Sequence, residues 1–122
     1  MRGGNRTDIG LWGEQRAADE LKRRGYAIKA ARYRCREGEI DLVAAGFGYL
    51  CFVEVKLRKD ASMGEAREYV TRAKQRKLRT AALRYLSEHP TSLQPRFDVV
   101  EVYAPQGTKT KEPVVRLWEN AF

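Results

Sequence analysis

Two acidic residues, Asp41 and Glu54, stand on either side of a short glycine turn in this chain. The flanking segments, 38–43 and 51–56, alternate in polarity with the period of two that is typical of a β-strand. Folding them about Gly46-Phe47-Gly48 places Asp41 roughly opposite Glu54, where side chains of an antiparallel pair lie about 4.5 to 5.5 Å apart. Because two carboxylates that close repel, we expect a proton, a cationic side chain or a metal ion to compensate them.

Carboxylate oxygens are the ligands of a hard divalent cation such as Mg²⁺, which is commonly held by one or two acids, with waters and phosphate oxygens completing the octahedron. The spacing Asp-x12-Glu-x-Lys therefore predicts that Asp41 and Glu54 hold a metal. Lys56 would reach the same face, either to steer an attacking water or to neutralise phosphate charge. The alternative is an ordinary antiparallel sheet with one solvated face, on which such residues are common.

Alternation also predicts which side chains share a face of the sheet. In the first segment Asp41 is expected on the face of Glu39 and Val43, and Ile40 on the opposite face with Leu42.

The cysteine and histidine content restricts the other kinds of catalysis. The chain has two cysteines, Cys35 and Cys51, and one histidine, His89. These counts leave no four-ligand Cys/His zinc site and argue against a Ser-His-Asp triad. Cys51 shares a strand face with Val53, which favours a reduced thiol in the core. Catalysis, if present, falls to carboxylates and lysine.

A helix expected near the N-terminus carries an acid on its apolar face. At about 100° per residue, Glu14 lies within the stripe formed by Leu11, Ala18 and Leu21. A carboxylate there is costly to bury without a partner, so we expect it to meet a cation, a metal or a water-filled cleft. The alternatives are that it reaches solvent or pairs with an arginine.

A second helix, expected from residue 65 or 66 to Glu88, carries most of the excess positive charge. Lys74 projects from the same arc as Leu78 and Tyr85, so it is either a functional ammonium or a lysine whose stem lets the charge reach solvent. The other basic residues are interpreted as phosphate contacts or as a solvated face. They are Arg72, Arg76, Lys77 and Arg79.

The net charge indicates a polyanionic partner. Lys and Arg total 24 against 16 Asp and Glu, a net charge of +8 in 122 residues, and nucleic acid is the first candidate. No apolar run approaches the roughly 18 residues of a membrane span, and the first residues open no secretory segment. We therefore expect a cytoplasmic protein with no membrane partner.

The chain is expected to fold as one domain, residues 1–122, with residues 1–7 flexible. Helices are expected at 8–24 and 65–88, strands at 26–34, 38–43, 51–57, 96–103 and 114–118, and a mobile connection at 58–64. The order α-β-β-β-α-β, with a final strand, predicts an α/β domain with a mixed central sheet flanked by helices. The second helix is long enough for a parallel crossover between the third and fourth strands.

The ordered motifs resemble the YraN-like family of the PD-(D/E)XK nuclease superfamily, which is similar to archaeal Holliday junction resolvases, over nearly the whole chain. The first-helix motif is Gly10-x-x-Gly13-Glu14-x-x-Ala17, and the central signature is Gly38-Glu39-Ile40-Asp41-Leu42 followed by Phe52-Val53-Glu54-Val55-Lys56-x-Arg58. Lys74 and Arg96-Phe97-Asp98 resemble the later blocks. Ile40 stands where the superfamily name has proline.

The resemblance implies a core of the restriction-endonuclease-like type and a role for each motif residue. Asp41 and Glu54 would hold Mg²⁺ or Mn²⁺ with the backbone carbonyl of Val55, and Lys56 would orient or activate water. Glu14 would be an auxiliary metal ligand or a group that contacts the ligands, and it is counted with the catalytic residues. Lys74 would contact phosphate, and Arg58 is counted with the basic residues of the second helix as a nucleic-acid contact.

The leading hypothesis is therefore a metal-dependent endonuclease that hydrolyses phosphodiester bonds in DNA, with branched or repair-intermediate DNA as the substrate that the resemblance suggests. The alternative is a catalytically silent nucleic-acid-binding module with a nuclease fold; a third reading is a basic structural or ribosome-associated protein. The sequence leaves dimerisation open, although resolvase-like relatives suggest a homodimer.

Overall fold

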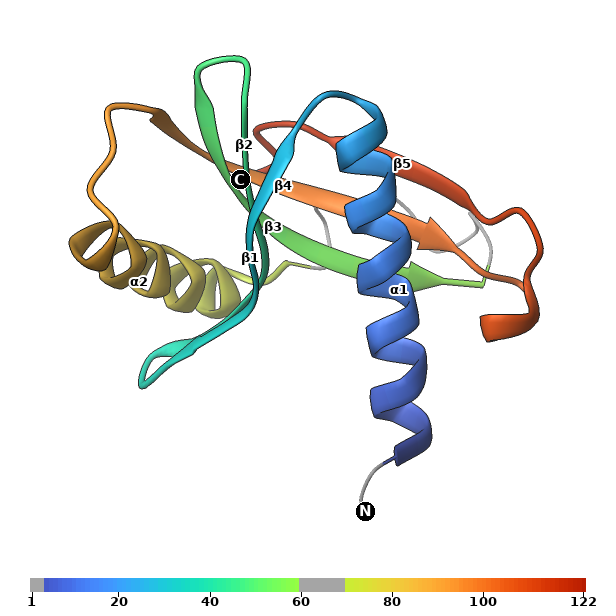
Figure 1. The fold of residues 1–122 in the computed structure, drawn as a ribbon. Coiled ribbons are helices and arrows are strands. Elements are labelled where there is room, and N and C mark those ends of the chain that lie inside the picture. The colour runs from blue at the N-terminus through green and yellow to red at the C-terminus, as the bar shows by residue number, and fades with distance from the viewer. Residues whose placement is uncertain (1–3, 60–69) are drawn as a thin grey trace.

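A computed structural model describes residues 4–59 and 70–122 of the chain, with side chains from residue 8 onward in the first of these ranges. The elements follow the order α1 (Gly4–Arg23), β1 (Ala27–Cys35), β2 (Gly38–Gly46), β3 (Tyr49–Arg58), α2 (Arg72–Glu88), β4 (Gln94–Tyr103), the short 3-10 helix η3 (Gly107–Lys109) and β5 (Val114–Trp118). Figure 1 shows the two long helices against one twisted sheet. The predicted order of elements, including the final strand, is confirmed.

The five strands form one mixed sheet in the order β1-β2-β3-β4-β5. The β3–β4 pair is parallel and the other three pairs are antiparallel. Because parallel neighbours need a long connection, the segment that contains α2 makes the crossover, as predicted. The fold is thus a single-domain α/β sheet with two helices, consistent with a restriction-endonuclease-like core.

Each face of the sheet is covered by one helix. Leu78, Ala81 and Tyr85 of α2 belong to one buried cluster, which also contains Phe52 and Val99 from the sheet. The other cluster joins α1 to the opposite face, and it includes Ala17, Ala18, Leu21, Leu42, Val53 and Val100. The two apolar stripes predicted from helical periodicity are the surfaces that close the core.

The predicted faces of β2 are wrong at Ile40. Its side chain packs in the α2 cluster with Val43, whereas Leu42 lies in the α1 cluster. The β2–β3 pairing ends at Leu42↔Val53, but β1 and β2 remain paired as far as Cys35↔Gly38. A two-stranded ribbon twists more strongly than a wider sheet, and this extra twist accounts for the change of face. In Figure 1 the free end of the β1–β2 hairpin projects toward α2.

Both helices begin at positions other than those predicted. α1 starts at Gly4, so residues 4–7, expected to be flexible, are helical. Its predicted end is confirmed: Gly25 has φ +104, and the N–H of Tyr26 donates to the carbonyl of Leu21 at 2.9 Å, which closes the helix in a Schellman motif.

α2 begins at Arg72, where the hydroxyl of Thr71 accepts the N–H of Lys74 at 3.1 Å. Val70 and Thr71 are not helical, so the continuous helix predicted from residue 65 or 66 is wrong at these positions. A threonine N-cap, which satisfies an unpaired N–H of the first turn, is the signal that fixes this start. Residues 65–69 of the predicted helix and residues 60–64 of the predicted connection lie outside the described residues.

Candidate active site

The candidate site lies where β2 separates from β3. The last pair of their ladder is Leu42↔Val53, and its continuation places Asp41 opposite Glu54, as the alternation predicted. A cleft of about 460 Å³ opens at this point, between the first half of α1, the β1–β2 hairpin, β3 and the first turn of α2. Its charged lining residues are Glu14, Arg32, Arg34, Glu39, Asp41, Glu54 and Lys74.

Asp41 is the acid whose protonation the cleft alters most. Oδ2 of Asp41 accepts the backbone N–H of Val55 at 2.8 Å. Burial and then the charge of Glu54 raise the pKa of Asp41 from 3.8 to about 7, although the Val55 N–H and the ammonium of Lys74 oppose this shift. The predicted repulsion between the two acids is therefore present in the folded chain.

Glu54 is compensated by two lysines from different elements. Its side chain is 6% exposed, and Oε2 lies 3.4 Å from Nζ of Lys56 on β3 and 3.6 Å from Nζ of Lys74 on α2. These are ion-pair distances, longer than a charge-assisted hydrogen bond. Lys56 was predicted as a compensator of the acids, but contact between Lys74 and Glu54 was not. The crossover through α2 is what brings Lys74 to the same carboxylate.

Glu14, the acid on the apolar stripe of α1, forms an ion pair with an arginine, which is one of the alternatives that the sequence left open. Nε of Arg32 donates to Oε1 of Glu14 at 2.8 Å, and the two side chains are 27% and 15% exposed. Glu14 also contributes to the raised pKa of Asp41, so three acids influence one cleft.

Arg32 is a cleft residue that sequence reasoning missed. It lies on β1 between the pairs Ala31↔Leu42 and Tyr33↔Ile40, and therefore opposite Asp41. Its φ of +53 is uncommon for a residue with a side chain and marks local backbone strain within a strand. The sequence contained one signal, since Arg32 and Arg34 alternate along β1 and could have been recognised as one basic face.

Arg34 and Glu39 are also cleft residues that were not predicted. Nε of Arg34 donates to Oε2 of Glu39 at 2.6 Å across the β1–β2 hairpin. The Arg34 side chain is 73% exposed, so its guanidinium remains accessible at the rim.

Arg58, which was predicted to contact nucleic acid, is buried at the end of β3. Its side chain is 6% exposed, and Nη1 donates to Oε2 of Glu101 at 2.7 Å. Oε1 of Glu101 in turn accepts Nε1–H of Trp118 at 2.6 Å and the hydroxyl of Tyr103 at 3.1 Å. In the sheet Arg58 lies opposite Tyr103 of the parallel neighbour, β4, and its role as a nucleic-acid contact stays a prediction.

The other basic residues predicted to contact nucleic acid are exposed on α2: Arg72, Arg76, Lys77 and Arg79. The guanidinium of Arg79 also lies 4.7 Å from the ring centre of Phe97, a cation–π arrangement. Their accessibility is compatible with phosphate contacts, and that role stays a prediction.

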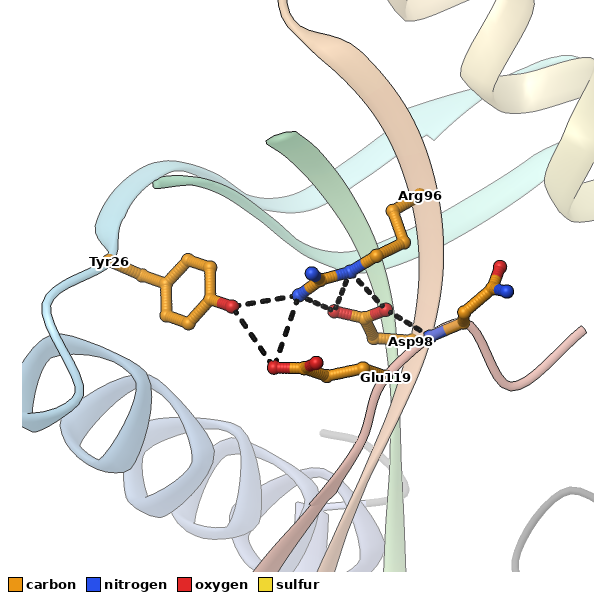
Figure 2. Close-up of polar contacts among 5 residues, drawn as sticks. Tyr26, Arg96, Asp98 and Glu119 are labelled. Carbon is orange, nitrogen blue, oxygen red and sulfur yellow. Dashed lines mark hydrogen bonds and ion pairs between the residues drawn. The ribbon is translucent and has the colours of Figure 1, made fainter. Parts of the chain in front are cut away.

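Arg96 and Asp98 of the Arg96-Phe97-Asp98 motif form a buried polar network with Tyr26 (Figure 2), whereas Phe97 packs against the α2 cluster. Arg96 donates to both carboxylate oxygens of Asp98, at 2.9 and 3.2 Å from Nε, and Nη2 reaches the hydroxyl of Tyr26 at 2.8 Å. Asp98 is 0% exposed and also accepts the backbone N–H of Asn120 at 2.9 Å. This motif ties β4 to the end of α1 and to the residues after β5.

The donor set fits a metal that retains waters rather than a closed cage. Among the described residues, no group of three or more His, Cys, Asp or Glu side chains is placed to hold a metal ion. Asp41 and Glu54 supply two carboxylates that line an open cleft, and after burial the charge of Glu54 contributes to the raised pKa of Asp41. Mg²⁺ accepts such a set because one or two carboxylates and waters satisfy it.

Neither of the two long helices that the structure describes is both long and apolar enough to cross a bilayer.

A mixed five-stranded sheet between the two long helices described, opened by a cleft with acids and basic residues, defines an α/β protein whose core is consistent with the restriction-endonuclease-like type. The chain belongs to Uncharacterised protein family UPF0102, whose sequence model matches residues 13–102. The predicted resemblance to the YraN-like family is thereby confirmed.

Relatives of the chain extend over most of its length. A UPF0102 protein of Roseiflexus castenholzii is 45% identical over 101 residues, covering 81% of this chain and 82% of the relative. One from Lachnoclostridium phytofermentans is 42% identical over 120 residues, covering 97% and 95% of the two chains. One from Caldanaerobacter subterraneus is 38% identical over 123 residues and covers both chains completely.

Proposed function

We propose that the protein is a Mg²⁺- or Mn²⁺-dependent endonuclease of the PD-(D/E)XK superfamily that hydrolyses phosphodiester bonds in DNA. The observation that carries the proposal is that Asp41, Glu54 and Lys74 line one open cleft, with the ammonium of Lys56 beside Glu54. A solvated sheet face would not need a half-buried acid with a pKa of about 7 beside a second, buried acid.

Asp41 and Glu54 would hold the metal, with the backbone carbonyl of Val55 as a third ligand. A metal bound there would polarise the phosphoryl group and lower the pKa of a bound water. The buried position of Glu54 fixes its carboxylate, and the N–H of Val55 fixes that of Asp41. Both acids are therefore oriented before any ligand arrives, which lowers the cost of binding.

The two lysines that contact Glu54 would handle negative charge on the substrate. Lys74 lines the cleft and its side chain is 46% exposed, so its ammonium can turn from Glu54 to a phosphate oxygen. Lys56, 32% exposed, lies beside the acids and would orient the attacking water or stabilise the developing charge. Arg34 at the rim would add a contact to a neighbouring phosphate.

The exposed basic residues of α2 are evidence for a polyanionic substrate that is bound through its phosphate backbone. Contacts to phosphates carry little sequence information and weaken steeply with salt. Binding should therefore tolerate many sequences and fall with ionic strength. Branched or repair-intermediate DNA is the substrate that resemblance to the resolvases favours.

A nuclease fold without turnover, acting as a nucleic-acid-binding module, is the second candidate. Its supporting observation is that Glu54 already has two ammonium partners in the folded chain. In that case the lysines would neutralise the acid permanently, and binding of DNA would not depend on a divalent cation.

One experiment separates the two candidates. Branched, flapped, single-stranded and duplex DNAs are incubated with Mg²⁺ or Mn²⁺ and either the wild-type protein or Glu54→Gln, while thermal unfolding is followed with and without the metals. We expect cleavage and a metal-dependent rise in Tm for the wild type alone, because a ligand that binds only the folded state stabilises it. Equal cleavage by both proteins would defeat the assignment, and DNA binding with no metal response in either would favour the silent module.

A further inference from the structure

A second hollow, of about 380 Å³, lies at the opposite end of the β2–β3 hairpin from the cleft. Its lining includes Arg24, Tyr26, Phe47, Tyr49, Arg96 and Glu119. Both hollows lie along α1. Gly10, in the first half of the helix, lines the cleft, and Arg24, just after its end, lines the second hollow. At a rise of 1.5 Å per residue the two are separated by roughly 20 Å.

Phe47 occupies a backbone conformation that its residue type disfavours. The pair Gly46↔Tyr49 closes a two-residue loop, in which Phe47 has φ +57 and Gly48 has φ +85. Two positive φ values are the mark of a type I′ turn, whose preferred sequence is Asn-Gly. Phe47 is also 68% exposed, so the core gains little from its burial. Turn geometry disfavours a phenylalanine here and the residue stays largely exposed, which points to a role for the ring outside the chain.

The aromatic rings around Phe47 are held in a built arrangement. The rings of Tyr26 and Phe47 meet edge to face, with centroids 5.1 Å apart. A Cβ at Gly46 would lie 2.8 Å from the Tyr26 ring, and one at Gly25 would lie 3.1 Å from the Phe47 ring. The absence of side chains at these two glycines is therefore what allows the rings to lie against the hairpin and the end of α1.

Arg96 gives the hollow a fixed planar cation. Its guanidinium lies 4.6 Å from the ring centre of Tyr49, which is 37% exposed. The bidentate bond to Asp98 holds this guanidinium in place, and Figure 2 shows it between Tyr26 and Asp98 with Glu119 nearby. The Glu119 side chain is 56% exposed and supplies a hydrogen-bond acceptor at the edge.

These groups match the chemistry of an unpaired nucleobase. Bases that are not stacked in a duplex bind by stacking on aromatic rings and guanidinium planes, and their amino groups donate to carboxylates. Three exposed basic residues at the end of α1 can contact the adjoining phosphates, although Glu20 pairs with two of them. They are Lys22, Arg23 and Arg24.

We propose that this hollow, with Phe47 as its stacking ring, binds an unpaired base of a nucleic acid whose backbone runs along α1 to the cleft. The inference rests on the proposed function in one respect: it takes nucleic acid as the ligand. It does not require that the protein cleaves this ligand. A site for a base about 20 Å from the acids would select strands that contain unpaired nucleotides at that distance from the scissile phosphate.

The test is the variant Phe47→Asn, because asparagine tolerates positive φ and keeps the turn. The probe is a single-stranded deoxyoligonucleotide that contains 2-aminopurine, whose fluorescence falls when the base stacks, in buffer with EDTA and no divalent metal. We expect the wild type to quench the probe, and Phe47→Asn to lose the quenching and about tenfold in affinity, as for one lost stacked base. Binding of a fully paired duplex should change little.

Leu83→Asn on α2 is the matched control, because Leu83 is also 68% exposed. It should leave both quenching and affinity unchanged. Unchanged quenching and affinity in Phe47→Asn would overturn the proposal, as would conversion of a dimer to a monomer in sedimentation with no change in oligonucleotide binding, since a second copy would then cover the ring. The binding assay contains no metal, so its result does not depend on cleavage. A protein that stacks the base in this assay but cuts no DNA with Mg²⁺ or Mn²⁺ refutes the nuclease alone. A protein that cuts DNA but binds the oligonucleotide equally well without Phe47 refutes the base site alone.

Discussion

Oδ2 of Asp41 accepts the backbone N–H of Val55 at 2.8 Å, across the point at which β2 and β3 separate. This bond fixes the carboxylate near Glu54 in spite of their repulsion, and Asp41 retains a pKa of about 7. The site thus holds unfavourable charge in the folded chain, as sites that bind cations or phosphates commonly do. Four expectations about stability and activity follow from the contacts around it.

The stability of the metal-free protein should depend on pH through Asp41. Burial and Glu54 raise its pKa from 3.8 to about 7, so the folded state binds the proton more tightly than the unfolded state. This contribution is fully present below about pH 4 and is lost as the pH rises through about 7. Asp41→Asn should therefore raise the free energy of unfolding at pH 8 by up to roughly 4 kcal/mol relative to wild type, since each pKa unit is worth about 1.4 kcal/mol.

Urea unfolding of both proteins at a series of pH values measures that difference. The gain from Asp41→Asn should shrink toward zero near pH 4, whereas carboxylates that do not interact with Asp41 affect both proteins alike. A difference that does not vary with pH would show that Asp41 is not the strained group.

Loss of either lysine beside Glu54 should impair cleavage while leaving the fold intact. Lys56→Met is expected to lower kcat by about 10² or more, as for loss of a group that acts in the reacting step, and Lys74→Met to act mainly through KM. Because one lysine remains beside Glu54 in each variant, the free energy of unfolding should change by less than about 1 kcal/mol.

Steady-state kinetics on the cleaved DNA, with thermal unfolding alongside, provide the measurement. Lys109→Met, which removes an exposed lysine on η3, controls for the loss of one positive charge. If all three variants lowered activity equally, general electrostatics rather than position would explain the effect.

The Arg32–Glu14 pair should contribute to stability through Glu14. Arg32→Met leaves that carboxylate, 15% exposed, without its bond at 2.8 Å and close to Asp41, so unfolding should become easier by about 1 to 3 kcal/mol. Methionine is as strained as arginine at φ +53, so backbone strain cancels in the comparison.

The double variant Glu14→Gln with Arg32→Met should recover much of the loss, because no acid is then left unpaired. A double-mutant cycle by chemical denaturation gives the coupling free energy directly. Strictly additive effects would mean that the two side chains do not stabilise each other.

Substitutions of Arg58 and Arg72 should have different effects, the first on stability and the second on nucleic-acid binding. Arg58→Met removes one partner of a buried ion pair with Glu101 and should cost about 3 to 5 kcal/mol, seen as a large fall in Tm. Arg72→Met, at an exposed position of α2, should leave Tm unchanged and weaken DNA binding with a shallower salt dependence.

Anisotropy titrations at several salt concentrations, together with calorimetry, distinguish the two arginines. An Arg58→Met protein with unchanged Tm but weakened DNA binding would restore the role that the sequence first suggested for it.

The local part of the site was predictable because it depends on short-range pairing. A two-residue turn fixes the register of β2 and β3, so alternation alone placed Asp41 opposite Glu54 and Lys56 beside them. The polar residues on apolar stripes, Glu14 and Lys74, were also visible in the sequence because helical periodicity is local. For Glu14 a cation and a cleft were among the expected surroundings, and both are observed.

The partners of these residues were decided by tertiary structure. Whether Glu14 would meet Arg32, and Lys74 would meet Glu54, depends on how each helix crosses the sheet, which no local pattern states. Arg58 was predicted to contact nucleic acid, and the structure buries it beside Glu101 of β4. The sequence by itself determined the elements, the register of the hairpin and the candidate acids; the packing of distant elements decided which charges meet, because those contacts join segments that no turn holds in register.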